Sequence, residues 1–391
     1  MNNIYALEKD KCTGCSACQQ SCPKGCIKMK SGKNGFLYPS VDKDVCIECG
    51  KCLRVCPAYN ILPSREPVAC YAAFNKNDEL RGKSSSGGIF IELAKYVLAQ
   101  SGVVFGAVFD ESWNVHHVAA QTLESVYAMM GSKYVQSRVE DTYKEAKVYL
   151  NEGRTVLFSG TPCQIAGLNR YLSKSYSNLI TVDLVCHGVP GVKQWNEYLN
   201  EVRKKICQKQ SEQFKINNVL FRDKRISWEH YSLTISISCN NQIMDFSHDN
   251  STDIYIKGFL QNLYLRDSCF TCPSKKLSSG SDFTIGDLWG HKTIIANKIN
   301  TNKGISLIVV NTKNGYNLLQ LLKGVNIIPI DYNQAKYSNP NIINPTVKNE
   351  YMVSRFAQKE KEYSFCVAVN KTLKLPLYFR IVNKIKRICK S

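Results

Sequence analysis

Residues 12–23 read CTGCSACQQSCP, and residues 46–57 read CIECGKCLRVCP. Both runs have the spacing C-x-x-C-x-x-C-x-x-x-C-P, which puts three thiolates on one short loop and a fourth just beyond it. Three thiolates from one run and the fourth from the other can hold one cubic iron–sulfur cluster. The proline behind each fourth cysteine stops the chain from continuing as a helix. The pattern therefore predicts two 4Fe-4S clusters.

This spacing is typical of bacterial two-cluster ferredoxins, so the ligands of each predicted cluster can be assigned. The predicted ligands of cluster one are Cys12, Cys15, Cys18 and Cys56. Those of cluster two are Cys46, Cys49, Cys52 and Cys22. Zinc ribbons and disulfides are the alternatives. Zinc sites usually pair two C-x-x-C units without a fourth cysteine and a proline behind them, so the pattern favours iron–sulfur ligation.

The composition indicates a folded chain that keeps its thiols reduced. Of the 391 residues, 44% are hydrophobic and 21% are charged, which is ordinary for globular proteins. The N-terminus, MNNIYALEKDKC, lacks the apolar core of a signal peptide, and no run of about eighteen apolar residues could span a membrane. We therefore expect a cytoplasmic protein, whose 18 cysteines are free to bind metal.

The chain is strongly basic, with 51 Lys and Arg against 32 Asp and Glu and a net charge of +19. Such a charge can attract nucleic acid, but the lysines are spread along the chain rather than gathered in one patch, so we expect no nucleic-acid partner. Residues 1–60 carry nine basic and five acidic side chains. This segment could attract an acidic ferredoxin or flavodoxin-like electron donor, although a plain solvated surface explains the charge equally well.

Beyond the cysteine runs the pattern changes to alternating strands and helices, which predicts a mixed-sheet α/β domain behind an α+β ferredoxin domain. Pro63 and Pro67 bracket a polar segment that is typical of a linker. We place the ferredoxin domain at 1–64, the second domain at 65–355 and a tail at 356–391. Strands are expected at 35–41, 69–74, 102–109, 115–120, 154–158, 179–185, 216–221, 231–237, 242–246, 282–286 and 305–310. Helices are expected at 89–97, 138–150, 164–172, 193–208, 254–265 and 316–322.

The last part of the chain, 373–389, has the pattern of a basic amphipathic helix. Pro376 stands where a first helical turn would begin. The apolar face is formed by Leu377, Ile381, Ile385 and Ile388, and the basic residues Lys386, Arg387 and Lys390 fall opposite. A helix of this kind can lie on an anionic membrane surface or pack on its own domain. Peripheral membrane contact through the tail therefore stays open.

Four further cysteines are expected in loops next to strand ends. Cys163 opens a helix after one strand, Cys186 closes the next strand, and Cys269 and Cys272 form a C-x-x-C unit. If they converge on one point, they would hold a third 4Fe-4S cluster. A zinc site on the same ligands stays open, as does a reactive Cys163 whose pKa is lowered by the helix N-terminus.

The remaining cysteines and two polar groups carry weaker signals. The thiols that we interpret as ordinary ones are Cys26, Cys70, Cys207, Cys239, Cys366 and Cys389. Among these Cys26 is the least certain, because it lies close to the first run. His187 contacts a substrate or is structural, and the latter reading is favoured. Residues 222–224 with Trp228 line a pocket or form a solvated turn.

Taken together, the motifs of the second domain resemble those of a known family. They are Ser86-Gly87-Gly88, Gly131-Ser132-Lys133-Tyr134, Ser159-Gly160-Thr161-Pro162-Cys163-Gln164, Cys186-His187-Gly188, Cys269-x-x-Cys272 and Asp282-Phe283-Thr284-Ile285-Gly286-Asp287-Leu288-Trp289-Gly290. The sequence is similar to the beta subunits of deazaflavin-reducing hydrogenases and dehydrogenases, from the N-terminus to roughly residue 330. It most resembles a bacterial branch with a fused ferredoxin domain, often found among capsule and exopolysaccharide genes.

The resemblance implies FAD in the α/β domain with an iron–sulfur cluster beside it. It implies that Ser86, Gly87 and Gly88 approach the flavin phosphates, as a Gly-rich turn before a helix does. By the same resemblance, the remaining cofactor contacts are Ser132, Lys133, Tyr134, Lys303 and Gly304. No motif identifies a deazaflavin pocket, so the family name does not decide the substrate.

These observations predict an iron–sulfur flavoprotein oxidoreductase. A low-potential donor would supply electrons through the 4Fe-4S clusters to FAD, and from there to an organic acceptor. By association with the family branch, that acceptor is a small molecule such as a sugar nucleotide or a lipid-linked sugar in polysaccharide biosynthesis. The rival hypothesis is a non-catalytic electron-transfer subunit that feeds a partner enzyme.

Overall fold

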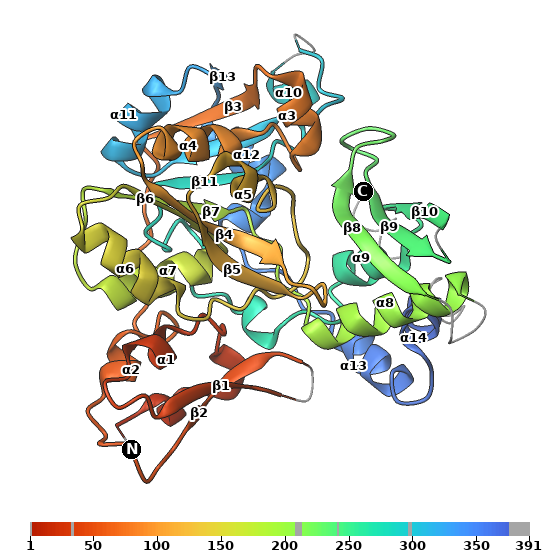
Figure 1. Cartoon of the computed structure of the whole chain (residues 1–391), viewed down its shortest axis with the longest axis horizontal. Coiled ribbons are helices and arrows are strands. Elements are labelled where there is room, and N and C mark those ends of the chain that lie inside the picture. The colour runs from red at the N-terminus through yellow and green to blue at the C-terminus, as the bar shows by residue number, and fades with distance from the viewer. Residues whose placement is uncertain (1, 33–34, 208–212, 241, 296–298, 375–391) are drawn as a thin grey trace, which may run out of the picture.

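A computed structural model describes residues 2–32, 35–207, 213–240, 242–295 and 299–374 of the chain. Figure 1 shows an N-terminal module beneath a large central sheet, with a separate β-hairpin layer and its helices at the side of the sheet. We refer to these parts as the ferredoxin module, the central domain and the side domain. None of the helices in the described ranges is long and apolar enough to cross a membrane.

The ferredoxin module is built from two cysteine loops and one hairpin. Each loop leads into a short helix, and these are α1 (Ala17–Ser21) and α2 (Lys51–Arg54). Strand β1 (Ile27–Ser31) pairs antiparallel with β2 (Leu37–Val41), which lies within the predicted strand at 35–41. The 3-10 turns η1 (Ile4–Ala6) and η2 (Lys9–Lys11) precede the first loop. The core of this small module consists largely of cysteine side chains, which leaves it dependent on what those cysteines bind.

The central domain contains an eight-stranded mixed sheet in the order β13-β3-β12-β11-β7-β6-β4-β5. Its strands are β3 (Ala69–Asn75), β4 (Val103–Phe109), β5 (Val115–Ala120), β6 (Val156–Gly160), β7 (Leu179–Leu184), β11 (Phe283–Asp287), β12 (Ser306–Val310) and β13 (Val325–Pro329). Strands β4, β6, β7 and β11 run parallel, and the outer pairs are antiparallel. This confirms the predicted mixed sheet, whose buried central strands read as continuous apolar runs.

Helices cover both faces of this sheet. They are α3 (Asp78–Lys83), α4 (Ile89–Leu98), α5 (Leu123–Tyr127), α6 (Thr142–Asn151), α7 (Pro162–Leu172), α10 (His291–Ile294), α11 (Lys313–Leu321) and α12 (Tyr332–Ser338). Helices α6 and α7 pack on one face through Tyr143 and Ile165, against Phe105 and Phe158 of the sheet. Helices α4 and α11 bury apolar side chains in a second cluster with other strands. The ferredoxin module lies next to α6 and α7 (Figure 1).

The side domain pairs an antiparallel three-stranded sheet with four helices. The strands, in the order β10-β9-β8, are β8 (Phe214–Asp223), β9 (Ser232–Cys239) and β10 (Gln242–Asp249). The helices are α8 (Val192–Ile206), α9 (Ile254–Leu260), α13 (Glu350–Lys359) and α14 (Phe365–Leu373). Its core is rich in aromatic side chains, among them Trp195, Tyr198 and Tyr255. Such large rings supply much of the apolar area that a small layer needs.

The C-terminal tail expected at 356–391 begins inside this side domain. Phe356 of α13 and Phe365 of α14 are buried against α8 and α9. The amphipathic helix expected at 373–389 lies, beyond Lys374, outside the described residues. Two expected helices also differ in length. The helix at 138–150 begins at Thr142, and that at 254–265 ends at Leu260, shortly before Asn262 adopts positive φ.

Candidate functional site

The N-terminal cysteines line two separate hollows, grouped as the spacing predicts. One hollow is lined by Cys12, Cys15, Cys18 and Cys56. A second is lined by Cys22, Cys46, Cys49 and Cys52, with Cys26 beside them. Each hollow therefore takes three cysteines from one run and one from the other. Among the described residues no three His, Cys, Asp or Glu side chains converge on a point for a single metal ion. The cysteine sets surround spaces instead, as a cubic cluster requires.

The two hollows differ in their exposure to solvent. The cluster-one cysteines are all buried, whereas Cys49 is exposed and Cys22 and Cys46 are half-buried. Cluster two is thus the outer site of the module, and cluster one is the inner site.

The four predicted core cysteines come together at one edge of the central sheet. Strands β6 and β7 are parallel neighbours, so Cys163, after β6, and Cys186, after β7, lie at adjacent carboxyl ends. The segment between α9 and β11 brings Cys269 and Cys272 to the same edge. Each of the four thiols interacts electrostatically with at least one of the others. We call this set the core cysteine group.

Burial governs the acidity of this group. It raises the pKa of Cys163 to about 11, with a further increase from the Cys272 thiolate. Burial likewise raises the pKa of Cys186 to about 11, and it raises those of Cys269 and Cys272. This direction does not favour the alternative of a low-pKa Cys163, because burial outweighs the hydrogen bond from the Thr161 hydroxyl and the charge of Arg266, which both lower the pKa. Each of the four side chains keeps some solvent exposure, and iron would supply the positive charge that their thiolates need.

Two buried cations adjoin the core cysteine group, and sequence reasoning missed both. Lys275 Nζ donates to the carbonyl of Cys186 at 2.6 Å and to that of Asn341 at 2.7 Å. Its charge lowers the pKa of Cys186 and Cys272, against the larger effect of burial. Arg266 is 1% exposed and lowers the pKa of Cys163 in the same way. Each stands three residues from a cysteine of the C-x-x-C unit, which was the only signal in the sequence.

Arg266 also connects the core cysteine group to the ferredoxin module. Its guanidinium donates to the carbonyls of Cys12 at 2.6 Å and Leu37 at 2.8 Å, and to Gln136 Oε1 at 3.0 Å. The guanidinium also lies over the Tyr38 ring, 4.4 Å from its centroid. A single buried side chain of the central domain therefore contacts the first cysteine loop and the hairpin of the module.

Helix α7 brings cluster one next to the core cysteine group. A Cβ built on Gly167 would lie 3.0 Å from Cys15 Sγ, so a larger residue here would have to push Cys15 away by a few tenths of an ångström. The thiolate of Cys163, at the start of the same helix, is near enough to raise the pKa of Cys15, after burial and Cys56. Gln20 of the module accepts hydrogen bonds from two backbone amides at the start of α6. The three cysteine sets thus follow one another from cluster two through cluster one to the core cysteine group.

The turn predicted to hold flavin phosphates lies between β3 and α4 and packs on β12. Gly87 N donates to Ser306 Oγ at 2.9 Å, and Ser86 Oγ donates to the Ile305 carbonyl at 2.8 Å. Gly88 is the N-cap of α4 in left-handed conformation and provides no capping side chain. The amides of the first turn of α4 are therefore not capped by this residue.

The side chain of Lys224 holds this turn in place through hydrogen bonds to backbone carbonyls. Lys224 Nζ donates to the carbonyls of Ser86 at 2.6 Å, Lys303 at 2.5 Å and Arg81 at 2.9 Å, and burial lowers its pKa to about 7. Gly304 has a φ of +95°, and a Cβ there would lie 2.6 Å from the Ser86 carbonyl oxygen. The structure thus brings Ser86, Gly87 and Gly88 together with Lys303 and Gly304. Lys224 joins residues 81, 86 and 303, so the interpretation of 222–224 as a solvated turn is wrong.

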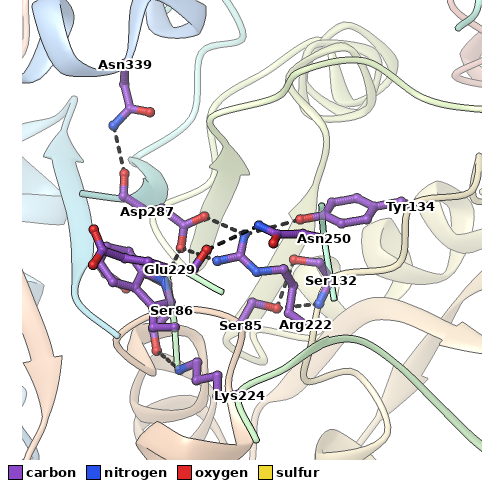
Figure 2. A network of polar contacts seen from close by, with 12 residues as sticks. Ser85, Ser86, Ser132, Tyr134, Arg222, Lys224, Glu229, Asn250, Asp287 and Asn339 are labelled. Carbon is purple, nitrogen blue, oxygen red and sulfur yellow. Dashed lines mark hydrogen bonds and ion pairs between the residues drawn. The ribbon is translucent and has the colours of Figure 1, made fainter. Parts of the chain in front are cut away.

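The segment 131–134 lies next to the same turn. Ser132 N and Oγ both hydrogen-bond to Ser85 Oγ, at 2.6 and 2.9 Å. Lys133 Nζ donates to backbone carbonyls that include Met130 at 3.1 Å, and burial lowers its pKa to about 7. The Tyr134 hydroxyl accepts from Arg222 at 3.3 Å. Figure 2 shows the Ser132–Ser85 and Tyr134–Arg222 contacts within one polar network.

The centre of that network is Asp287, from the motif that ends β11. Its carboxylate accepts two hydrogen bonds from Arg222, at 2.8 and 3.2 Å, and one from Trp228 Nε1 at 2.8 Å (Figure 2). Trp289 stacks on Trp228 with ring centroids 5.1 Å apart. The motif therefore joins the central sheet to β8 of the side domain, beside the predicted cofactor turn.

The structure also places the two weaker sequence signals, which are His187 and the remaining cysteines. His187 lies between Asn262, at 2.6 Å, and Asn341, at 3.4 Å, and burial lowers its pKa. These side-chain contacts favour its structural reading. Of the spare thiols, Cys207 and Cys239 lie with their Sγ atoms 2.7 Å apart, and Cys70 and Cys366 are buried in apolar cores. Cys389 lies outside the described residues.

The loops, sheet edge and cysteine sets together define an iron–sulfur oxidoreductase. Comparison with known families agrees: a 4Fe-4S dicluster domain matches residues 11–60. The N-terminal and C-terminal domains of the coenzyme F420 hydrogenase/dehydrogenase beta subunit match residues 70–143 and 153–331. The chain belongs to this beta-subunit family, whose members are subunits of enzyme complexes.

Among solved structures, the chain is similar to one chain of the F420-reducing NiFe hydrogenase complex from Methanosarcina barkeri, in a xenon-derivatised form. The two share 16% sequence identity, and the TM-score is 0.44 over 74% of this chain and 98% of that one. A search of curated proteins found no match.

Proposed function

We propose that the chain is an FAD-dependent iron–sulfur oxidoreductase with three 4Fe-4S clusters. The proposed ligands are the cysteines of cluster one, those of cluster two and the core cysteine group. Iron–sulfur cubes supply one-electron transfer, and FAD supplies the exchange between single electrons and a hydride. The observation that carries the proposal is the order of the three cysteine sets, from the outer site with its exposed Cys49, through the buried cysteines of cluster one, to the core cysteine group at the edge of the central sheet.

The outer site offers a surface for the electron donor. Val45 and Ile47 are 44% and 58% exposed, and Ile47, Lys24, Glu48 and Lys51 line the cluster-two hollow. An exposed apolar surface with two lysines suits a protein partner, and the net basic charge of residues 1–60 would attract an acidic ferredoxin or flavodoxin-like protein. The exposed Cys49 would bring the cluster close to such a partner.

The cofactor turn supports FAD on the other side of the core cysteine group. The family resemblance supplies the cofactor, and the chain supplies a Gly-rich turn before the ten-residue helix α4, which is a favourable site for phosphate. Lys224 holds the turn through its hydrogen bonds to backbone carbonyls, and Lys303 forms an ion pair with Asp78 at 2.8 Å beside it. The proposed contacts remain Ser86, Gly87, Gly88, Ser132, Lys133, Tyr134, Lys303 and Gly304.

For the acceptor, we propose an organic molecule, with a sugar nucleotide or lipid-linked sugar as the first to test. The buried pair of Arg222 and Asp287, next to the flavin contacts, is the polar group best placed to orient such an acceptor. In the rival function, the chain passes electrons to a partner enzyme and binds no acceptor itself. The family's membership in multi-subunit complexes favours keeping this second candidate. The proposed location is the cytoplasm, with peripheral membrane contact through the C-terminal tail.

The test is anaerobic purification and reconstitution, followed by analysis of iron, sulfide and flavin. The proposal expects about twelve iron atoms and one FAD per chain. About eight irons without flavin would contradict it and leave a simple ferredoxin relay. Turnover by the purified chain with dithionite and candidate sugars would then separate the enzyme from the electron-transfer subunit.

A further inference from the structure

A fifth cysteine lies at the cluster-two site. Cys26 follows Cys22 by four residues, and the two Sγ atoms are 3.3 Å apart. Both side chains line the hollow that also contains Cys46, Cys49 and Cys52. Cys26 further interacts with the Cys46 thiol. In sequence Cys26 is nearest to the first cysteine run, but the structure places it with cluster two.

The backbone holds Cys26 in this position. Gly25 has a φ of +62°, which reverses the chain after Cys22, and its amide donates to the Cys22 carbonyl at 3.2 Å. The Cys26 carbonyl accepts from Asp42 N at 2.8 Å, which anchors the start of the β1–β2 hairpin. The thiol therefore faces the hollow because of the turn and the hairpin.

The two neighbouring thiols differ in their protection. Cys26 is 7% exposed, whereas Cys22 is half-buried. Oxidants and competing ligands can therefore reach Cys22, as they can Cys46 and the exposed Cys49, whereas Cys26 is shielded from them. A buried thiol at 3.3 Å from it is close enough to replace it with little movement of the chain.

We propose that Cys26 is a reserve ligand of cluster two, which takes over the iron that Cys22 normally binds. This inference rests on the proposed 4Fe-4S cluster at that site. In the exchange the Fe–S bond to Cys22 breaks and the Cys22 thiolate takes up a proton. The Cys26 thiol gives up a proton and forms the new Fe–S bond, so no electrons are gained or lost. The site would thus keep its cube after loss of Cys22, its one ligand from the first cysteine run.

Three variants test this in the full chain: Cys22→Ala, Cys26→Ala and the double variant. Each is reconstituted anaerobically, its iron and sulfide are counted, and its reduced electron paramagnetic resonance spectrum is recorded. Cys70→Ala, a buried thiol on β3 outside both hollows, is the matched control. Circular dichroism and the iron of the other clusters report whether each variant folds.

The expected result is that Cys26→Ala resembles the wild type. Cys22→Ala keeps the iron of cluster two but shows altered g-values, because the ligand has changed. The double variant alone loses up to about four iron atoms. Equal iron loss in Cys22→Ala and the double variant would overturn the proposal, as would iron loss in Cys26→Ala. If the wild type itself lacks iron, the proposed function fails rather than the reserve-ligand assignment.

Discussion

The cysteine sets of the ferredoxin module and the core cysteine group contrast in how they are assembled. Each module hollow draws on two short runs, and its small surrounding core consists largely of the cysteines themselves. The core cysteine group draws on three loops, from Cys163 to Cys272, which the central sheet brings to one edge. Two buried cations accompany the core group, whereas the outer module site opens to solvent. Ligands that lie close together in the sequence can be brought into place by the metal itself. Ligands that lie far apart in the sequence need a folded scaffold to bring them together.

The largest effect is expected when one thiol of the core cysteine group is removed. Cys269→Ala should lose about four iron atoms and all electron transfer from the module to bound flavin, since no other carrier lies between them. The module clusters should keep their iron and their paramagnetic signals. Cys366→Ala, a buried thiol on α14, is the control and should transfer electrons normally. Loss of all iron in Cys269→Ala would show that the two regions are not independent.

The next largest effect is expected when the Arg266 contact between the ferredoxin module and the central domain is removed. Arg266→Gln should lower the free energy of unfolding by about 3 kcal/mol, because two or more buried acceptors lose a charged donor. Arg266→Lys keeps the charge and should recover part of this loss. The thermal midpoint and the rate of proteolytic cleavage in the linker at 58–67 measure the effect. Unchanged cleavage in the Gln variant would contradict a role of Arg266 in docking the module.

A smaller effect is expected at the proposed flavin site of the central domain. Gly304→Ala should weaken FAD binding about tenfold, which corresponds to roughly 1.4 kcal/mol, because φ is +95° and the Cβ would meet the Ser86 carbonyl. Flavin fluorescence titration measures the affinity. Gly82→Ala on α3, where an added Cβ meets nothing within 4 Å, is the matched control. The iron content of both variants should equal that of the wild type.

The smallest effect concerns acid stability of the core. Burial lowers the pKa of His117 to about 4, from an ordinary value of 6.5, while its ring contacts Ser137 Oγ and the Ser159 carbonyl. Because the unfolded chain binds the proton first, stability is complete above about pH 6.5 and falls as the pH drops toward 4. Between pH 7 and 5.5 the loss should be about 1 kcal/mol.

His117→Gln should flatten this dependence of the thermal midpoint on pH, since glutamine does not titrate. His248→Gln, at an exposed position on β10, should leave the slope unchanged. Equal slopes in all three proteins would show that His117 is not responsible.

Much of the fold could be predicted because its signals are local. Continuous apolar runs correctly located β4 and β6, and alternation located β9. Strand β13 escaped prediction because it is a short edge strand that ends in Pro329. Strand β1 escaped because its exposed lysines hide the pattern.

The candidate site, like the fold, could be predicted only where its sequence signals are local. Cys12 to Cys56 could be grouped in advance because a repeated spacing fixes which loops can share a cube. For Cys163, Cys186 and the C-x-x-C unit, spacing carried no such information, and the convergence follows from adjacent parallel strands. Arg266 and Lys275 could not be identified as neighbours of the group, because a single cation in a loop has no distinctive pattern.

The sequence by itself determined the ligand chemistry of the module, since thiolates spaced within a few residues must meet wherever the chain turns. Only the tertiary structure decided that α7 brings Cys15 beside the core group, that Arg266 joins the two regions and that Cys26 faces the outer hollow. The physical reason is that spacing constrains neighbours along the chain, whereas burial and charge compensation depend on segments that packing alone brings together.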